Sequence, residues 1–388
     1  MTAACSTLAQ HLEISHIAHG LSDGRIIVVG AGLAGLAAAA RLVKAGRQVL
    51  VLDASERAGG QIHTVRAEGL VVELGAEGFV ARSQALPALC GLLGIESALV
   101  DQLTTDTYSL EESGLVLLPP GEAARRLGFQ VPVEELGRGI RSLAQGMGQL
   151  IEALLGAVGA QHIRLACGVR QISRDKQGLL VELGDGQRER AADVVLATPA
   201  RTASLLTAPL GVPEVAPLAS APLLSNVSVN LQYRRDQIAS YPPGSGVIFP
   251  DSFASVGLRA LSIVEHKFAG RAPAGCSLLR VFFRPHDDAL RTWTDERFAA
   301  EAAAAIARVL GVQGVPAQTW VSRWADALPV FSAEHRAQVA AADRALQELH
   351  VHVSGSAFHG AGIDAAVASA EIVAARLGAA APLGAPSP

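Results

Sequence analysis

The hydrophobic pattern near the start of the chain predicts a buried β-α-β unit. Residues 26–29 form a continuous apolar run, which is typical of a strand covered on both faces. A glycine-rich turn follows, strong helix formers fill residues 36–45, and a second apolar strand is predicted at residues 48–52. A strand, a helix and a strand within about thirty residues form a β-α-β unit, which pairs its strands in parallel and winds right-handed.

Further along, the pattern changes to alternating apolar and polar positions and then changes back. A helix is predicted at residues 147–158, and residues 193–197 read as another buried strand. Shorter strands are predicted at residues 163–165, 169–173 and 179–183, and alternation typical of an antiparallel sheet marks residues 227–233, 246–249, 258–264, 278–283 and 318–323. An Ala-rich helix is predicted at residues 295–310, and residues 351–354 and 365–377 return to a buried strand and a helix.

These patterns give the fold class α/β plus α+β: a Rossmann-like nucleotide-binding domain with an inserted antiparallel-sheet substrate domain. We predict an N-terminal extension at residues 1–23 and a disordered tail at residues 379–388. The predicted nucleotide-binding domain is discontinuous, at residues 24–100, 143–205 and 340–378, and the substrate domain takes residues 101–142 and 206–339.

Composition narrows the kind of protein but not its chemistry. Half of the 388 residues are hydrophobic and 18% are charged, so the chain can bury a sizeable core. The net charge of −4 argues against a nucleic-acid partner, and no apolar run reaches the ~18 residues of a membrane span. The start of the chain does not read as a signal peptide. The four cysteines lie far apart, which disfavours disulfides and metal sites and fits a reducing, cytoplasmic location: Cys5, Cys90, Cys167 and Cys276.

The turn after the first strand has the GxGxxG spacing of a dinucleotide cradle. Gly30 permits a tight turn, Gly32 lets the backbone approach a pyrophosphate, and Gly35 lets the helix pack closely on the strand. The free N–H groups at the helix N-terminus suit a phosphate. Asp53, at the end of the second strand, can accept hydrogen bonds from ribose hydroxyls. The alternative is a purely structural glycine turn.

A second motif follows at once. Asp53 is followed by Arg57, Gly59, Gly60 and Gln61, and this order resembles the second nucleotide-contact signature of the FAD-binding amine oxidase superfamily. Arg57 can neutralise a diphosphate, and the two glycines let the chain pass close to a flavin. The alternative is a surface loop with a chance arginine.

Later segments narrow the resemblance. The chain resembles oxygen-dependent, FAD-type protoporphyrinogen and coproporphyrinogen oxidases in landmarks that occur in the family's order at residues 73–82, 146–154, 194–200, 268–273, 323–329 and 355–363. The resemblance implies FAD as the cofactor and the amine oxidase type of fold over nearly the whole chain. It implies FAD contacts at Gly30, Ala31, Gly32, Leu33, Ala34, Gly35, Asp53, Ala54, Arg57, Gly60, Gln61, Gly75, Ala76, Glu77, Gly78, Val169, Trp324, Ala361, Gly362 and Ile363.

Three departures from the family pattern bear on function. Asp53 stands where glutamate is commoner, and Gln61 stands where lysine or arginine is usual. Between Gly121 and Gly146 a short segment replaces a much longer region that lines the substrate pocket in the family and helps to dock the membrane. The macrocycle site and any peripheral membrane contact are therefore open questions.

The resemblance implies stepwise dehydrogenation of a porphyrinogen, either protoporphyrinogen IX or coproporphyrinogen III, in haem or porphyrin biosynthesis. O2 would be the acceptor, giving hydrogen peroxide, and six electrons must be removed in all. Two alternatives stay open: a flavin amine oxidase or desaturase acting on another small substrate, and a weakly catalytic flavin-binding carrier of a tetrapyrrole. The expected partners are the small-molecule substrate and O2, and a homodimer is left open.

Catalytic side chains are not identifiable in the sequence. His359, in the turn before the last helix, is a candidate proton acceptor beside the flavin, but a histidine of a surface turn is the favoured interpretation. No spacing predicts a metal site. Substrate carboxylates could bind to arginines that are at least as well explained as solvated or ion-paired side chains: Arg82, Arg125, Arg126 and Arg138.

Overall fold

The computed structural model of the protein describes residues 24–80, 84–128, 139–250 and 257–379. Its first layer is a parallel sheet in the order β19-β13-β1-β2-β9. The strands are β1 (Ile26–Val29), β2 (Val49–Leu52), β9 (Ile163–Arg164), β13 (Asp193–Leu196) and β19 (Val351–Val353). The apolar run at residues 26–29 is buried throughout, as a strand covered on both faces requires.

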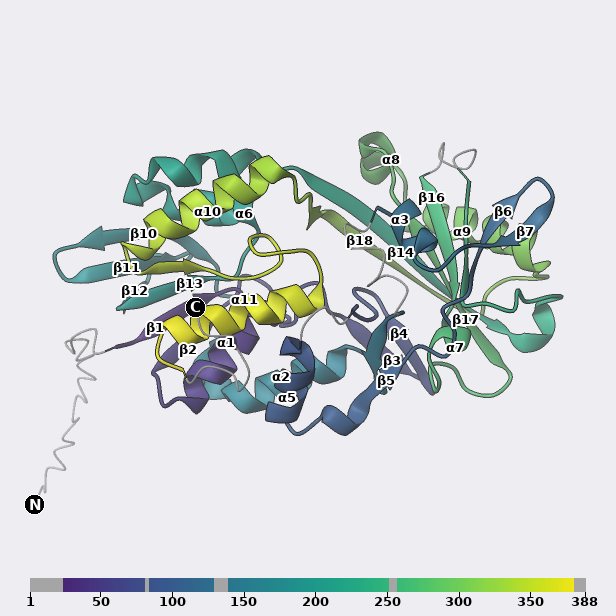
Figure 1. The fold of residues 1–388 in the computed structure, drawn as a ribbon, viewed down its shortest axis with the longest axis horizontal. Coiled ribbons are helices and arrows are strands. Elements are labelled where there is room, and N and C mark those ends of the chain that lie inside the picture. The colour runs from purple at the N-terminus through teal and green to yellow at the C-terminus, as the bar shows by residue number, and fades with distance from the viewer. Residues whose placement is uncertain (1–23, 81–83, 129–138, 251–256, 380–388) are drawn as a thin grey trace, which may run out of the picture.

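Helices cover both faces of this sheet (Figure 1). One face packs against α1 (Leu33–Lys44), α2 (Ala85–Leu92), α5 (Gly148–Val158) and α11 (Ile363–Arg376). The other face packs against α6 (Ala200–Thr207), α10 (Ala333–Gln347) and an antiparallel sheet of β10 (Val169–Asp175), β11 (Gly178–Leu183) and β12 (Arg188–Ala191). The alternation within β1 explains this, because Ile26 and Val28 face the first set of helices whereas Ile27 and Val29 face the second.

The second lobe is built on a seven-stranded sheet in the order β18-β14-β17-β16-β15-β6-β7. All neighbours in it are antiparallel except β15 and β6. The strands are β6 (Thr107–Glu111), β7 (Gly114–Leu117), β14 (Leu223–Arg234), β15 (Gly246–Ile248), β16 (Leu258–Ile263), β17 (Cys276–Phe283) and β18 (Gln318–Pro329). Helix α9 (Asp295–Leu310) packs its apolar side against one face, with Phe298 at the centre.

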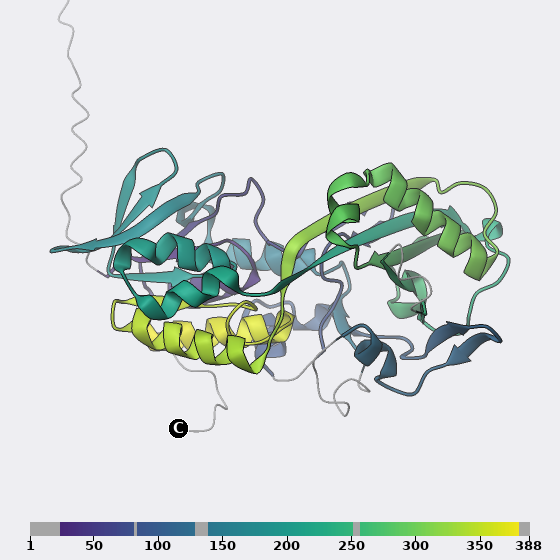
Figure 2. The same ribbon diagram turned by 90° about the horizontal axis from the view of Figure 1, so that it is seen from above.

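Short elements complete the structure. They are β3 (Thr64–Ala67), β4 (Leu70–Glu73), β5 (Leu99–Asp101), β8 (Arg141–Leu143), α3 (Glu122–Arg126), α7 (Val264–Lys267) and α8 (Asp287–Thr292). The long strands β14 and β18 run from one lobe into the other (Figure 2). The fold class predicted from the sequence, including the amine oxidase type of architecture, is confirmed.

The predicted elements differ from the structure mainly at their ends. Helix α1 begins three residues earlier than predicted, and β18 continues to Pro329 past a register shift against β14. Helix α10 was not predicted, and it packs on the parallel sheet. The exact domain boundaries stay a prediction. Ala379, the first residue of the predicted tail, is buried in the core, and residues 1–23 and 380–388 lie outside the described chain.

Candidate active site

The glycine turn between β1 and α1 is shaped by its own tight packing. A Cβ placed on Gly30, whose φ is +109°, would lie 2.5 Å from the carbonyl oxygen of Ala197, and one on Gly35 would lie 1.9 Å from that of Gly30. At Gly32 a Cβ would meet only the Cα of Gly60, at 3.9 Å. Gly30 and Gly35 are therefore required by the fold, whereas Gly32 has room beside its backbone.

The start of α1 is suited to an anion. Its N-cap is Gly32, no side chain caps it, and no acidic residue lies in its first turn. The backbone N–H groups of that turn therefore have no side-chain acceptor, and with the helix dipole they form a site for a phosphate group. Leu33 and Ala34, two of the predicted contacts, are the first residues of this turn.

Asp53 links the cradle to the segment predicted to hold an adenosine. Its Oδ2 accepts a hydrogen bond from the N–H of Ala31 at 2.6 Å, and its carbonyl oxygen accepts one from Cys167 at 2.7 Å. A Cβ on Gly168 would lie 3.4 Å from the Cβ of Ala54. Val169 follows directly and begins β10. The structure thus brings Asp53, Ala54 and Val169 to one place, although they are far apart in the sequence.

The second motif packs against the first. The N–H of Gly59 donates to the carbonyl of Ala31 at 2.8 Å, and a Cβ on Gly60 would lie 3.2 Å from the Cα of Gly32. The guanidinium of Arg57 donates to carbonyl oxygens of its own loop, including that of Gly60 at 2.7 Å. Desolvation lowers the pKa of Arg57, and the charge of Asp53 opposes this. Arg57 therefore shapes the loop as well as adding positive charge to it.

The turn of residues 75–78 lies beside this loop. The N–H of Ala76 donates to the carbonyl of Gln61 at 3.0 Å, and a Cβ on Gly75 would lie 1.9 Å from the same oxygen. The Gln61 amide donates to the carbonyl of Ala327, and the indole N–H of Trp324 donates to that of Leu74 at 2.8 Å. Strand β18 therefore contacts both segments predicted to line the flavin.

The turn before α11 closes the same region. A Cβ on Gly355 would lie 3.2 Å from the Cβ of Ala34, which places this turn against the start of α1. Gly362, with φ of +96°, is the N-cap of α11, and Ile363 is buried just behind it, whereas Ala361 is exposed. The turn that leads into α11 thus begins against the first residues of α1.

The ring of His359 is held by the helices behind this turn. Its Nδ1 lies 2.7 Å from the hydroxyl of Ser369 on α11, and its Nε2 lies 3.9 Å from Oδ2 of Asp343 on α10. The side chain is 26% exposed. These contacts give His359 an anchoring role for the turn, and a role as proton acceptor stays a prediction.

The arginines considered for substrate carboxylates are engaged on α3 or lie outside the described chain. Arg125 donates twice to Glu122, at 2.7 Å each, and Arg126 donates to Glu122 at 3.0 Å and to Ser109 at 2.9 Å. Arg82 and Arg138 fall in segments that the structure does not describe.

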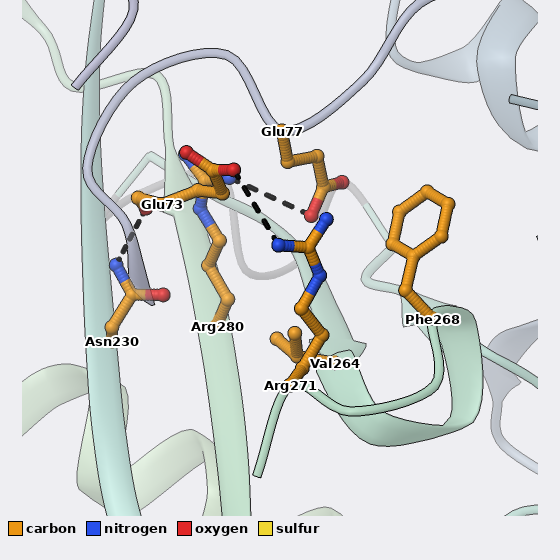
Figure 3. A pocket seen from close by; sticks show the side chains of 7 residues that line it. All are labelled: Glu73, Glu77, Asn230, Val264, Phe268, Arg271 and Arg280. Atoms are coloured by element: carbon orange, nitrogen blue, oxygen red, sulfur yellow. Dashed lines mark hydrogen bonds and ion pairs between the residues drawn. The ribbon is translucent and has the colours of Figure 1, made fainter. Parts of the chain in front are cut away.

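A buried ion cluster, missed by the sequence analysis as a site, lies between the lobes. It consists of Glu73, Glu77, Lys267, Arg271 and Arg280. Figure 3 shows these side chains except that of Lys267. Glu73 is the last residue of β4 and Glu77 lies in the turn that follows it, whereas the cations come from α7, the loop after it and β17. The side chains of Arg271 and Arg280 are 1% and 4% exposed. Since a buried charge is costly unless it is paired, loss of any one partner would destabilise the contact between the lobes.

Each carboxylate of the cluster has its own environment. Glu73 accepts hydrogen bonds from the hydroxyl of Thr64 at 2.7 Å and the N–H of Met147 at 2.6 Å, and burial raises its pKa above the ordinary value. For Glu77, burial opposes ionisation, yet the charges of Lys267 and Arg280 bring the pKa below its usual range.

A cavity of about 10 Å³ lies at the centre of the cluster, enough for about one water molecule. Among the described residues, Nη1 of Arg271, Nε of Arg280 and Oδ1 of Asn230 line this region without a hydrogen-bond partner. The ion pairs across it are long, at 3.6 Å and 3.8 Å. A single water molecule at this position would satisfy several of these groups.

Comparison with known proteins shows to which family the chain belongs. The sequence model of the family of flavin-containing amine oxidoreductases matches residues 33–126 and 110–378. The chain belongs to this family. It is therefore an FAD-dependent oxidoreductase, and the open space at Gly32 beside the uncapped start of α1 fits the pyrophosphate of that cofactor. The two matched segments overlap at residues 110–126, next to the segment that is short in this chain.

Individual relatives agree with the family. The chain is 32% identical to coproporphyrinogen III oxidase of Propionibacterium freudenreichii over 59% of this chain and 43% of that enzyme. It is 22% identical to coproporphyrinogen III oxidase of Bacillus subtilis over 88% of this chain and 96% of that enzyme. A solved structure from Exiguobacterium sp. 255-15, assigned as a protoporphyrinogen oxidase, shares the fold with a TM-score of 0.78 at 22% identity, covering 92% of this chain and 99% of that one.

Among the residues that the structure describes, no helix is both long enough and apolar enough to span a membrane. No group of His, Cys, Asp and Glu in the same residues has the arrangement of a metal site.

Proposed function

We propose that this protein oxidises a porphyrinogen to the porphyrin, with coproporphyrinogen III as the first substrate to test. The observation that carries the proposal is the extent of the similarity to coproporphyrinogen III oxidase of Bacillus subtilis, which covers 88% of this chain. In sequence, amine-oxidising relatives align over much less of it: L-amino-acid oxidase of Mus musculus over 22% and putrescine oxidase of Kocuria rosea over 28%.

The overall chemistry is fixed by the substrate. Conversion of a porphyrinogen to a porphyrin removes six electrons and six protons, so it needs three two-electron steps. With O2 as acceptor, three molecules of O2 become three of hydrogen peroxide. When bound, FAD supplies the hydride acceptor, and the protein supplies its binding site, its orientation and the surrounding charge.

We propose that the predicted contacts hold FAD in three parts. The start of α1, with Gly32, takes the pyrophosphate, and Asp53, Ala54 and Val169 take the adenosine. The turn of residues 75–78, Trp324 and the turn of residues 361–363 take the flavin. The contacts that link the turn of residues 75–78 to Gln61, and the loop of Gly59 and Gly60 to the glycine turn, support this assignment.

Two arginines beside α3, Arg259 and Arg284, support the proposal that the substrate carries carboxylates. Arg259 donates to the carbonyl of Arg126 at 2.8 Å, and Arg284 donates to that of Leu127 at 3.0 Å. Desolvation and the nearby charge of Arg259 lower the pKa of Arg284. We propose that these arginines attract the carboxylate side chains of the substrate, of which coproporphyrinogen III has four. O2 as the natural acceptor, a homodimer and a cytoplasmic location stay predictions.

Anaerobic reduction of the bound flavin tests the function. We expect coproporphyrinogen III to bleach the absorbance of oxidised FAD, and air to restore it with release of hydrogen peroxide and a fluorescent porphyrin in a ratio of three to one. Arg284→Gln should raise KM for the tetracarboxylate more than it lowers kcat, whereas Arg190→Gln, a surface change in β12, should alter neither.

Three outcomes would contradict the proposal. Bleaching by amines but not by porphyrinogens would indicate an amine oxidase. Tight porphyrin binding without bleaching would indicate a carrier. Faster bleaching by protoporphyrinogen IX than by coproporphyrinogen III would move the assignment to the dicarboxylate substrate and remove the role given to Arg284.

A further inference from the structure

Arg280 reaches from the second lobe to the turn of residues 75–78. It lies on β17, and its Nη2 donates to the carbonyl of Gly75 at 2.6 Å and to the hydroxyl of Ser228 at 3.3 Å. Its Nη1 lies 3.6 Å from Oε2 of Glu77. One buried guanidinium thus binds both the backbone and the side chain of the turn of residues 75–78.

Lys267 holds the same turn from a second direction. Its ammonium group forms a close ion pair with Oε1 of Glu77, and both side chains are 14% exposed. The carbonyl of Glu77 accepts a hydrogen bond from Ser142, which in turn accepts one from Arg271. The turn is therefore fixed through its backbone and its carboxylate by cations of the other lobe.

This turn is in direct backbone contact with the nucleotide cradle. The carbonyl of Gln61 accepts a hydrogen bond from Ala76, and the loop that carries Gln61 binds Ala31 through Gly59. The contacts run without a break from Arg280 through the turn of residues 75–78 to the start of α1. A shift of Arg280 would therefore displace segments on which FAD depends.

The cluster also carries an excess of positive charge. Three cations face two carboxylates, so it carries one more positive than negative charge when every group is ionised. Protonation of Glu73 would increase the excess. Because the cluster is shielded from water, its field is weakly screened and extends into the neighbouring site. Gln61, the residue between the cluster and the cradle, is neutral and adds no cation of its own.

We propose that Arg280 and Lys267 are positioning residues for FAD that also tune its reduction: they fix the turn of residues 75–78, and the excess positive charge that they bring stabilises the cofactor in its reduced, more negative form. The inference rests on the placement of this turn beside the flavin and not on the identity of the substrate.

Two substitutions, one that removes a positive charge and one that removes a negative charge, test the inference. In the holoprotein, the midpoint potential of bound FAD is measured anaerobically against a reference dye for Arg280→Gln and for Glu77→Gln. We expect a more negative potential for Arg280→Gln, because a positive charge is lost, and a more positive potential for Glu77→Gln, because a negative charge is lost. Both variants should unfold at lower temperature than the wild type, since both break the cluster.

The opposite signs separate electrostatic tuning from mere support. If the cluster only holds the lobes together, both variants loosen the same contacts, and the two potentials shift in the same direction or stay unchanged; either result overturns the inference. Arg190→Gln, which breaks an exposed pair with Asp175, should leave the potential unchanged. If Arg280→Gln does not fold, Arg280→Lys and Lys267→Gln take its place, with no shift expected for the first and a negative shift for the second. No substrate is added, so failure here is distinct from failure of the proposed function.

Discussion

Replacement of Gly32 by alanine would place a methyl group in the space that the cradle leaves open. Gly32 has φ of −73° and ψ of −179°, a conformation that alanine adopts without strain. The new Cβ would lie 3.9 Å from the Cα of Gly60, which is ordinary van der Waals contact. The methyl group therefore fits in the protein without cofactor and occupies the place where we propose that the pyrophosphate approaches the backbone.

The expected magnitudes differ for folding and for binding. Alanine is a poorer N-cap than glycine by up to ~1 kcal/mol, but it reduces the entropy of the unfolded chain, which stabilises by about 0.4–1 kcal/mol. These effects oppose one another, so the free energy of unfolding of the apoprotein should change by less than about 1 kcal/mol. The FAD dissociation constant should rise by at least about tenfold, or about 1.4 kcal/mol.

Gly35→Ala is the matched comparison. Its Cβ would lie 1.9 Å from the carbonyl oxygen of Gly30, so β1 and α1 must move apart, and we expect a loss of stability at the upper end of the roughly 1–3 kcal/mol found for overpacked cores. Urea unfolding of the apoproteins and titration with FAD by flavin fluorescence measure the two quantities. Unchanged FAD affinity in Gly32→Ala would refute the proposed position of the pyrophosphate, and unchanged stability in Gly35→Ala would refute the packing.

Three further predictions concern stability and reactivity. Burial opposes ionisation of Asp193, but hydrogen bonds from His352 and His350 bring its pKa below the ordinary value of an aspartate. The stability that it contributes is therefore present above about pH 4 and is lost as the pH falls through the lowered pKa. Asp193→Asn should flatten this acid dependence in urea titrations from about pH 6 to about pH 2. Burial raises the pKa of Cys90 to about 11, so it should resist iodoacetamide at pH 8 until the protein is unfolded, and rapid labelling of the native protein would contradict its burial. Phe298→Ala should lower the free energy of unfolding by about 3–5 kcal/mol, because its ring is fully buried and packs edge-on against Phe283 at 5.4 Å, and a loss below 1 kcal/mol would refute this packing.

Local patterns were sufficient for the nucleotide-binding half of the site. The β1-α1-β2 unit, the glycine turn and the order of the two motifs are each encoded within a few dozen residues, and the structure places them as the sequence predicts. The local pattern also explains why helix α10 was not predicted. It has few large apolar residues and buries His335 and Asp343, so its amphipathic pattern is weak.

The ion cluster could not be predicted from the same patterns. In β14 the polar residues Ser228, Asn230 and Gln232 alternate with apolar ones, which indicates a strand with one face in water. The structure buries all three, because that face meets the other lobe. The amide of Asn230 donates to the carbonyl of Glu73, 157 residues earlier. Contacts between residues so far apart cannot be inferred from the pattern of a single sequence. A signal was present in Arg280, which interrupts the apolar run of β17 without a neighbouring turn.

The parallel sheet draws its strands from both ends of the polypeptide. β1 pairs with β13, β13 pairs with β19, and α11 packs over α1. During synthesis the glycine turn leaves the ribosome long before the strand and helix that complete its surroundings have been made. The FAD site is therefore complete only after β19 and α11 have been synthesised. A product that stops before residue 351 would leave the apolar surface of α1 exposed to proteases.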